Sequence, residues 1–158
     1  KNMIKEKNNC LKIKIVRDNY NGYVPSNYKI FKWAKKSFLK NKKSIVTIKL
    51  AKKKEIAELN KTYLKKLGEC NILSFPINLQ IDSGETILGD IIVCPAIINK
   101  ESNLYSINKE NRWAHMIIHS MLHLQGYTHF TKKNRLSMEK KEIMLMSNLG
   151  YSNPYYEN

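Results

Sequence analysis

H-S-M-L-H-L-Q-G-Y-T-H, residues 119 to 129, is the stretch of sequence from which the architecture can be worked out. Histidines four positions apart lie about one helical turn apart on one face, so the imidazoles of His119 and His123 can converge on one metal ion at about 2.0 Å. Gly126 can take the backbone conformation that ends a helix and turns the chain back, which brings His129 to the same ion. The stretch therefore predicts a helix, a turn and three nitrogen ligands to one zinc ion.

The number of ligands indicates a catalytic site. Three protein ligands leave a fourth coordination position for water, whereas structural zinc sites are closed by four. Zinc lowers the pKa of such a water toward about 7, so we predict a small zinc-dependent hydrolase with one Zn2+ per chain. His115 lies one turn before His119 and two turns from His123. This separation favours a local hydrogen bond or a substrate contact for His115 over a fourth zinc ligand, and a catalytic role for it stays open.

Length and composition fit one domain. The chain has 158 residues, of which 42% are hydrophobic, as in a folded globular protein. We expect a single zinc hydrolase domain over residues 1–150 and a C-terminal tail, which can fray, over 151–158. No stretch approaches the roughly 18 apolar residues of a membrane span and no signal-peptide core is seen, so a cytoplasmic location without a membrane partner is expected. The three cysteines form no C-x-x-C pair and are expected to be free thiols.

The formal net charge is +15, which attracts polyanions because each lysine or arginine that neutralises a phosphate releases a counterion. Nucleic acid is the natural candidate. The excess is almost all lysine, and it accompanies abundant asparagine and isoleucine, the residues that A/T-rich codons specify. Charge alone therefore names no substrate.

Periodicity outlines the remaining elements. Alternating apolar residues predict strands at 10–17, 44–50, 72–77 and 87–93, the last two joined as a hairpin across the turn-forming residues 82–85. Helical spacing predicts helices from Ser26 to about Leu39, at 52–64, at about 108–124 and at 131–149. In the last helix, four residues are predicted to face inward: Leu136, Met138, Ile143 and Met146.

The histidine spacing H-x-x-x-H-x-x-G-x-x-H is also that of the metzincin proteases, whose general base is a glutamate directly after the first histidine. Ser120 occupies that position here. Serine cannot accept a proton from a zinc-bound water as a carboxylate does, so a metalloprotease is the alternative and not the first choice.

Extended back to Trp113, the same region resembles the YbeY family of bacterial endoribonucleases. Three other segments resemble blocks of that family in the same order: L-N-K-T-Y at 59–63, N-I-L-S-F-P at 71–76 and L-G-D-I-I-V-C at 88–94. The likeness covers roughly residues 44–150. It implies an α+β fold, with a small mixed sheet packed against about four to five helices, and zinc held by His119, His123 and His129.

The resemblance also implies cleavage of single-stranded RNA in the maturation of small-subunit ribosomal RNA and in ribosome quality control, together with association with the small ribosomal subunit. Both hydrolysis by a zinc-activated water and attack by the RNA 2′-OH are compatible with the sequence. A different class stays open as well: a non-catalytic, zinc-stabilised ribosome-binding factor. The sequence does not decide the oligomeric state.

Three positions depart from the family pattern. Leu64 stands where the family has an arginine, Thr128 where it has an aspartate, and Ser120 where it has a glycine. Loss of the arginine removes a guanidinium expected to contact phosphate, for which Lys65 or Lys66 can substitute as a point charge. Ser74 is a further expected substrate contact, since the segment 74–76 could line an RNA groove.

Overall fold

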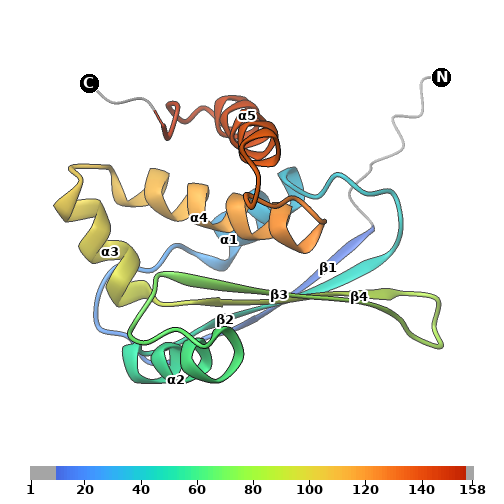
Figure 1. The fold of residues 1–158 in the computed structure, drawn as a ribbon, viewed down its shortest axis with the longest axis horizontal. Coiled ribbons are helices and arrows are strands. Elements are labelled where there is room, and N and C mark those ends of the chain that lie inside the picture. Colours follow the sequence, from blue (N-terminus) through green and yellow to red (C-terminus); the bar gives the residue numbers. More distant parts are fainter. Residues whose placement is uncertain (1–9, 156–158) are drawn as a thin grey trace.

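The computed structural model describes residues 10–155, which form four strands and five helices (Figure 1). The elements follow in this order: β1 (Leu11–Val16), α1 (Asn27–Lys36), β2 (Ser44–Leu50), α2 (Lys53–Leu64), β3 (Ile72–Gln80), β4 (Thr86–Val93), α3 (Pro95–Leu104), α4 (Lys109–Leu124) and α5 (Lys132–Asn148). The expected α+β fold with a small mixed sheet is confirmed.

The sheet has the strand order β1-β2-β4-β3. β1 and β4 each run parallel to β2, while β3 and β4 form the predicted antiparallel hairpin at one edge. Alternate residues of β2 are fully buried and those between them are half-buried, so one face of this strand is covered more completely than the other. The hairpin brings β3 alongside α4, and so places this edge of the sheet next to the helix that carries the histidines.

Helices cover both faces of the sheet. Figure 1 shows α1 and α4 on one face, with α5 packed outside α4, and α2 on the opposite face. The larger hydrophobic core lies on the α4 side and includes Trp33, Ile48, Trp113 and Met121, all buried. A smaller cluster joins α2 to the other face through Ile56 and Leu73. The histidine-bearing helix is therefore held by the main core.

Capping residues define the two helices that build the site. The Asn108 side chain accepts hydrogen bonds from the backbone N–H groups of Glu110 and Asn111 at the start of α4. Thr131 caps α5 in the same way by accepting from Asn134. Between them, Gly126 has φ +97°, a backbone conformation that favours glycine and lets the chain reverse directly after α4.

Four details differ from the sequence-based predictions. α3 was not predicted; its signal is Pro95 in the first turn, where a missing N–H costs nothing. α1 ends at Lys36, because the Ser37 hydroxyl donates to the Trp33 carbonyl and closes the helix before Phe38. β3 continues to Gln80, beyond the predicted strand end.

The fourth difference concerns the C-terminal segment. Residues 151–155 pack back on the protein: the Trp33 indole N–H donates to the Tyr151 hydroxyl at 3.0 Å, and Tyr155 reaches α5. The remainder of the expected tail lies outside the described residues. Within the described part of the chain, Cys10, Cys70 and Cys94 are free thiols, and no helix is long and apolar enough to cross a membrane.

Candidate metal centre

Three histidines converge where α4 ends and the chain turns toward α5. His119 and His123 come from α4 and His129 from the following loop, and each offers a nitrogen within 4.8 Å of the other two. The Nε2 atoms of His119 and His123 are 3.0 Å apart. Ligand atoms about 2.05 Å from a tetrahedral ion are about 3.3 Å apart, so the spacing fits a shared metal. The predicted set of residues is thus brought together by the fold.

The opposite ring nitrogens have fixed partners. His119 Nδ1 lies 2.9 Å from Glu142 Oε1, and His123 Nδ1 lies 2.9 Å from the Tyr127 carbonyl oxygen. Both partners are acceptors, so both Nδ1 atoms carry the proton and both Nε2 atoms present lone pairs. Two lone pairs facing each other at 3.0 Å repel unless a cation lies between them. The tautomers assigned from these contacts are those of metal-binding histidines.

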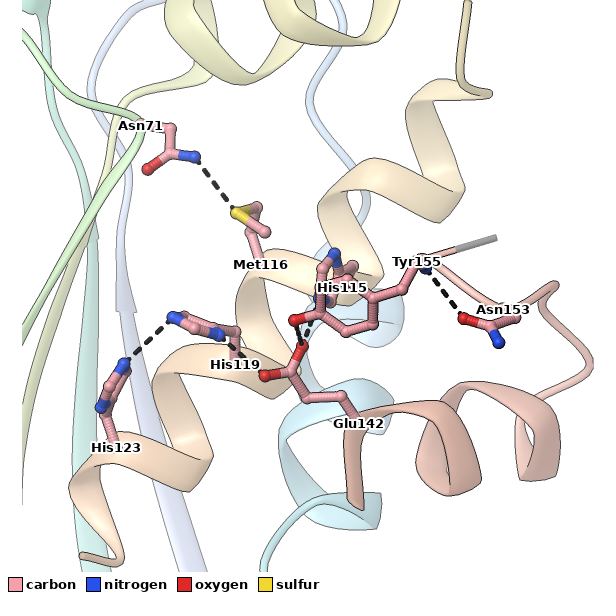
Figure 2. A network of polar contacts seen from close by, with 8 residues as sticks. All are labelled: Asn71, His115, Met116, His119, His123, Glu142, Asn153 and Tyr155. Atoms are coloured by element: carbon pink, nitrogen blue, oxygen red, sulfur yellow. Dashed lines mark hydrogen bonds and ion pairs between the residues drawn. The ribbon is translucent and has the colours of Figure 1, made fainter. Parts of the chain in front are cut away.

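Glu142 links the metal centre to a network of polar contacts with His115 and Tyr155 (Figure 2). One carboxylate oxygen faces His119, while the other contacts His115 Nε2 and accepts a hydrogen bond of 2.6 Å from the Tyr155 hydroxyl. Glu142 is fully buried, which raises its pKa, but the hydrogen bonds from His115 and His119 outweigh burial and lower the pKa to about 2. It therefore acts as a carboxylate acceptor for three donors, two from α4 and one from the C-terminal segment.

Glu142 and Tyr155 were not singled out from the sequence. A signal for Glu142 is present: it lies four residues after Met138 and four before Met146, so an acidic residue interrupts the inward-facing stripe of α5. Met138 and Met146 are buried as predicted, but Leu136 is 52% exposed. Leu136 and Met138 are two positions apart, and on a helix two such residues do not share a face.

The protonation of His123 favours metal binding. Burial lowers its pKa, the neighbouring charge of His119 lowers it further, and together these outweigh the hydrogen bond to Tyr127, giving a pKa of about 4. The imidazole is therefore neutral at physiological pH, which is the form that ligates a metal. The Tyr155 hydroxyl has its pKa raised by burial and by the Glu142 carboxylate, so it remains a proton donor.

The other predicted site residues lie at different distances from this centre. His115 contacts Glu142 and is not one of the three converging histidines; with His119 and Glu142 it forms a second group whose ligand atoms lie within 4.8 Å of one another. Ile72 packs on the α4 side and Leu73 on the α2 side, so the alternation of β3 puts Ser74 on the α4 face. The Ser120 hydroxyl is buried, and within residues 10–155 it has no hydrogen-bond partner.

The two lysines predicted to contact the substrate lie at the C-terminal end of α2. Lys65 ends α2 in the left-handed conformation and Lys66 follows it, at the end of the helix that covers the other face of the sheet. Both are exposed, and in the described part of the chain no hydrogen bond or ion pair joins either side chain to the metal centre. Leu64 beside them is 44% exposed and not a core residue.

Comparisons with known proteins agree with this geometry. The family model described as Endoribonuclease YbeY matches residues 7–150. A protein named Endoribonuclease YbeY from Buchnera aphidicola subsp. Schizaphis graminum is 42% identical over 84% of this chain and 85% of its own length. A relative of the same name from Methylococcus capsulatus is 37% identical over 85% of this chain and 89% of its own.

A solved structure supports the fold. The solution structure of a protein from Thermotoga maritima matches 92% of this chain and 100% of its own with a TM-score of 0.50, at 21% sequence identity. The order of the sequence blocks, the converging histidines and the family match over residues 7–150 lead to one assignment. This chain belongs to the Endoribonuclease YbeY family.

Proposed function

We propose that this protein is a zinc-dependent endoribonuclease that cleaves single-stranded RNA during maturation of small-subunit ribosomal RNA. The observation that carries the proposal is the convergence of three imidazoles, each with one ring nitrogen within 4.8 Å of the others. In His119 and His123 the opposite nitrogen, Nδ1, faces an acceptor. The relatives named Endoribonuclease YbeY support RNA as the substrate.

Zinc is the metal that fits the donor set best. Imidazole nitrogens suit zinc among the available divalent ions, and three histidines with a fourth position open are the ligand set of catalytic zinc. His115 Nε2 is engaged by Glu142, so it does not close the fourth position. This favours a catalytic site over one in which zinc only joins two helices.

When bound, zinc supplies a Lewis acid and a water of lowered pKa. The chain's own residues provide orientation: Glu142 fixes the ring of His119, and the Tyr127 carbonyl fixes that of His123. His129 is exposed, so the substrate reaches the centre from its side. Ser120 is buried in α4 and is not a carboxylate, so the general base of a metzincin protease is missing. In RNA cleavage the substrate's own 2′-OH can replace water as the nucleophile, and its proton must then be taken up by another base.

Charge supports a ribosomal partner. A net charge of +15 favours association with RNA, and a role in small-subunit maturation includes binding to that subunit. Because ribosomal RNA is the proposed substrate, a cytoplasmic location belongs to the same proposal.

The test is incubation of purified, metal-analysed protein with single-stranded RNA and with duplex RNA of the same sequence. We expect about one zinc per chain, cleavage of the single strand, little cleavage of the duplex, and loss of cleavage on chelation. Products ending in 2′,3′-cyclic phosphate would identify attack by the 2′-OH. Intact RNA after prolonged incubation with the zinc-loaded protein would contradict the proposal.

A further inference from the structure

A cavity of about 310 Å³ lies directly beside the metal centre. Its lining includes His119 and His129 from the centre itself, Arg135 and Glu139 from the first half of α5, and Tyr155 from the C-terminal segment. This volume is at the lower end of the range for small-molecule sites. A group bound there would lie next to the substrate atoms held at the metal.

Part of the cavity wall is aromatic or apolar. His129 and Tyr155 contribute rings, and the buried Met138 contributes its thioether. Tyr155 is held by its hydrogen bond to Glu142 and by an edge-on contact with His115, with ring centroids 5.2 Å apart (Figure 2). A ring fixed in this way presents a preformed surface, and unstacked RNA bases bind to such surfaces.

The edge of the cavity offers unpaired polar groups. Arg135 and Glu139 are one helical turn apart on α5, and both line the cavity. Among residues 10–155 neither side chain forms a hydrogen bond or an ion pair. The guanidinium donates and the carboxylate accepts, so together they can pair with the mixed donor and acceptor edge of a nucleobase.

Charge distinguishes a base from a second phosphate. Two carboxylates, Glu139 and Glu142, line the cavity against one guanidinium, that of Arg135. These carboxylates would repel a phosphate inside the cavity, but they would not repel a neutral planar group. The scissile phosphate belongs at the metal, and the cavity suits the base beside it.

We propose that this cavity binds one unstacked nucleobase adjacent to the scissile phosphate, with Arg135 and Glu139 at its hydrogen-bonding edge and His129 and Tyr155 at its face. The inference rests on the proposed function, since it names a substrate subsite of the same centre. It also gives a physical reason for single-strand preference: a base in a duplex is stacked and paired, and cannot enter the cavity without leaving the helix.

The cleavage test uses single-stranded RNA oligonucleotides with one abasic ribose placed on either side of the cleaved bond. At one of the two positions, loss of the base is expected to lower kcat/KM about tenfold in the natural sequence. Arg135→Leu and Glu139→Gln are expected to remove most of this difference while zinc content stays unchanged. Lys140→Leu, an exposed residue of the same helix, is the matched control and should keep the full difference.

A binding test is independent of cleavage. The free nucleosides cytidine, adenosine, guanosine and uridine, which carry no phosphate, are titrated into zinc-loaded protein by NMR, with inorganic phosphate as a second probe. Binding of at least one nucleoside that Arg135→Leu weakens supports the cavity even if RNA is not cleaved, and in that case only the proposed function fails. If RNA is cleaved but no nucleoside binds and neither abasic position matters, the nucleobase inference is overturned.

Discussion

The two ring nitrogens of His119, Nδ1 and Nε2, face different surroundings. On the Nδ1 side, His115, Glu142 and Tyr155 form a network in which Glu142 is fully buried and His115 is 6% exposed. On the Nε2 side, His123 is partly buried and His129 is exposed. One imidazole therefore separates a closed polar network from an open ligand set.

The two sides have different roles: one orients the ring of His119, and the other is open to a metal ion and to substrate. The closed side has its hydrogen bonds formed within the protein, so it can hold the ring of His119 in one orientation. The open side has nitrogen lone pairs directed at a point that solvent and substrate can reach. A catalytic metal needs both features. Ligands that are held rigidly but closed off from solvent make a structural site, and ligands that are open to solvent but lack hydrogen bonds to orient them are mobile.

The largest effect is expected on the open side. His123→Ala removes one of three ligands, so we expect zinc content to fall from about one per chain to a small fraction, with loss of RNA cleavage. Elemental analysis after dialysis measures this. The matched control is His115→Gln, which removes a histidine of the closed side and should retain zinc. Full zinc occupancy in His123→Ala would contradict the assignment of the ligands.

A smaller loss is expected when the closed side is altered without touching a ligand. Glu142→Gln keeps the shape of the side chain but weakens its hold on His119 Nδ1, and changes of this kind typically weaken metal binding 10- to 100-fold. Competition with a chromophoric chelator measures the affinity. Glu139→Gln, three residues earlier on α5, should leave zinc affinity unchanged. Equal affinities for Glu142→Gln and the natural protein would mean that the network does not support the metal.

Acid should separate the two sides in the metal-free protein. The folded-state pKa of His123, about 4, is below its ordinary value of 6.5, so its contribution to stability is present above pH 6.5 and is lost as pH falls toward 4. The pKa of Glu142, about 2 against 4.5, makes its contribution disappear between pH 4.5 and 2. The first loss is about 2 kcal/mol after allowance for partial exposure, since one pKa unit corresponds to about 1.4 kcal/mol.

Urea unfolding of the chelator-treated protein between pH 7 and 3 tests this order. His123→Gln should flatten the upper part of the profile and leave the lower part unchanged. A profile for His123→Gln that follows the natural protein throughout would show that this residue does not cause the upper loss.

The smallest effect is expected at the outer end of the closed side. Tyr155→Phe removes the hydroxyl that donates to Glu142 and leaves the ring in place. One of three donors to the carboxylate is lost, so we expect zinc affinity to fall only a few-fold, in line with a single hydrogen bond of about 1 kcal/mol. Tyr151→Phe is the control, because that hydroxyl contacts Trp33 and not Glu142. A hundredfold loss in Tyr155→Phe would mean that the segment closes the site by more than this bond.

The open side could be predicted from sequence, and the closed side could not. The three histidines lie within one short stretch, so helix geometry and one glycine were enough to bring them together. Glu142 lies 23 positions from His119 and Tyr155 lies 13 positions from Glu142, so their contacts exist only once α5 has packed on α4. The spacing of hydrophobic residues predicts each helix or strand separately and does not predict how α5 packs on α4.

The same limit applies to the fold. The β3–β4 hairpin joins neighbours in sequence and was predicted, whereas α3 is short and carries few apolar residues in a repeating pattern. The positions of Lys65 and Lys66 depend on which face of the sheet α2 covers, and no local pattern states this.

The burial of α4 has a consequence for how the protein acquires its metal. Ten of the 16 residues of this helix are buried, and most of them are apolar and contact the sheet or its neighbouring helices. Apolar burial on this scale does not depend on a bound ion, so we expect the metal-free chain to keep its fold, unlike a zinc finger. Such a protein can lose zinc during scarcity and be reloaded without new synthesis. Cellular metal supply would then set the active fraction of a stable pool, and chelation followed by zinc addition should restore cleavage without a refolding lag.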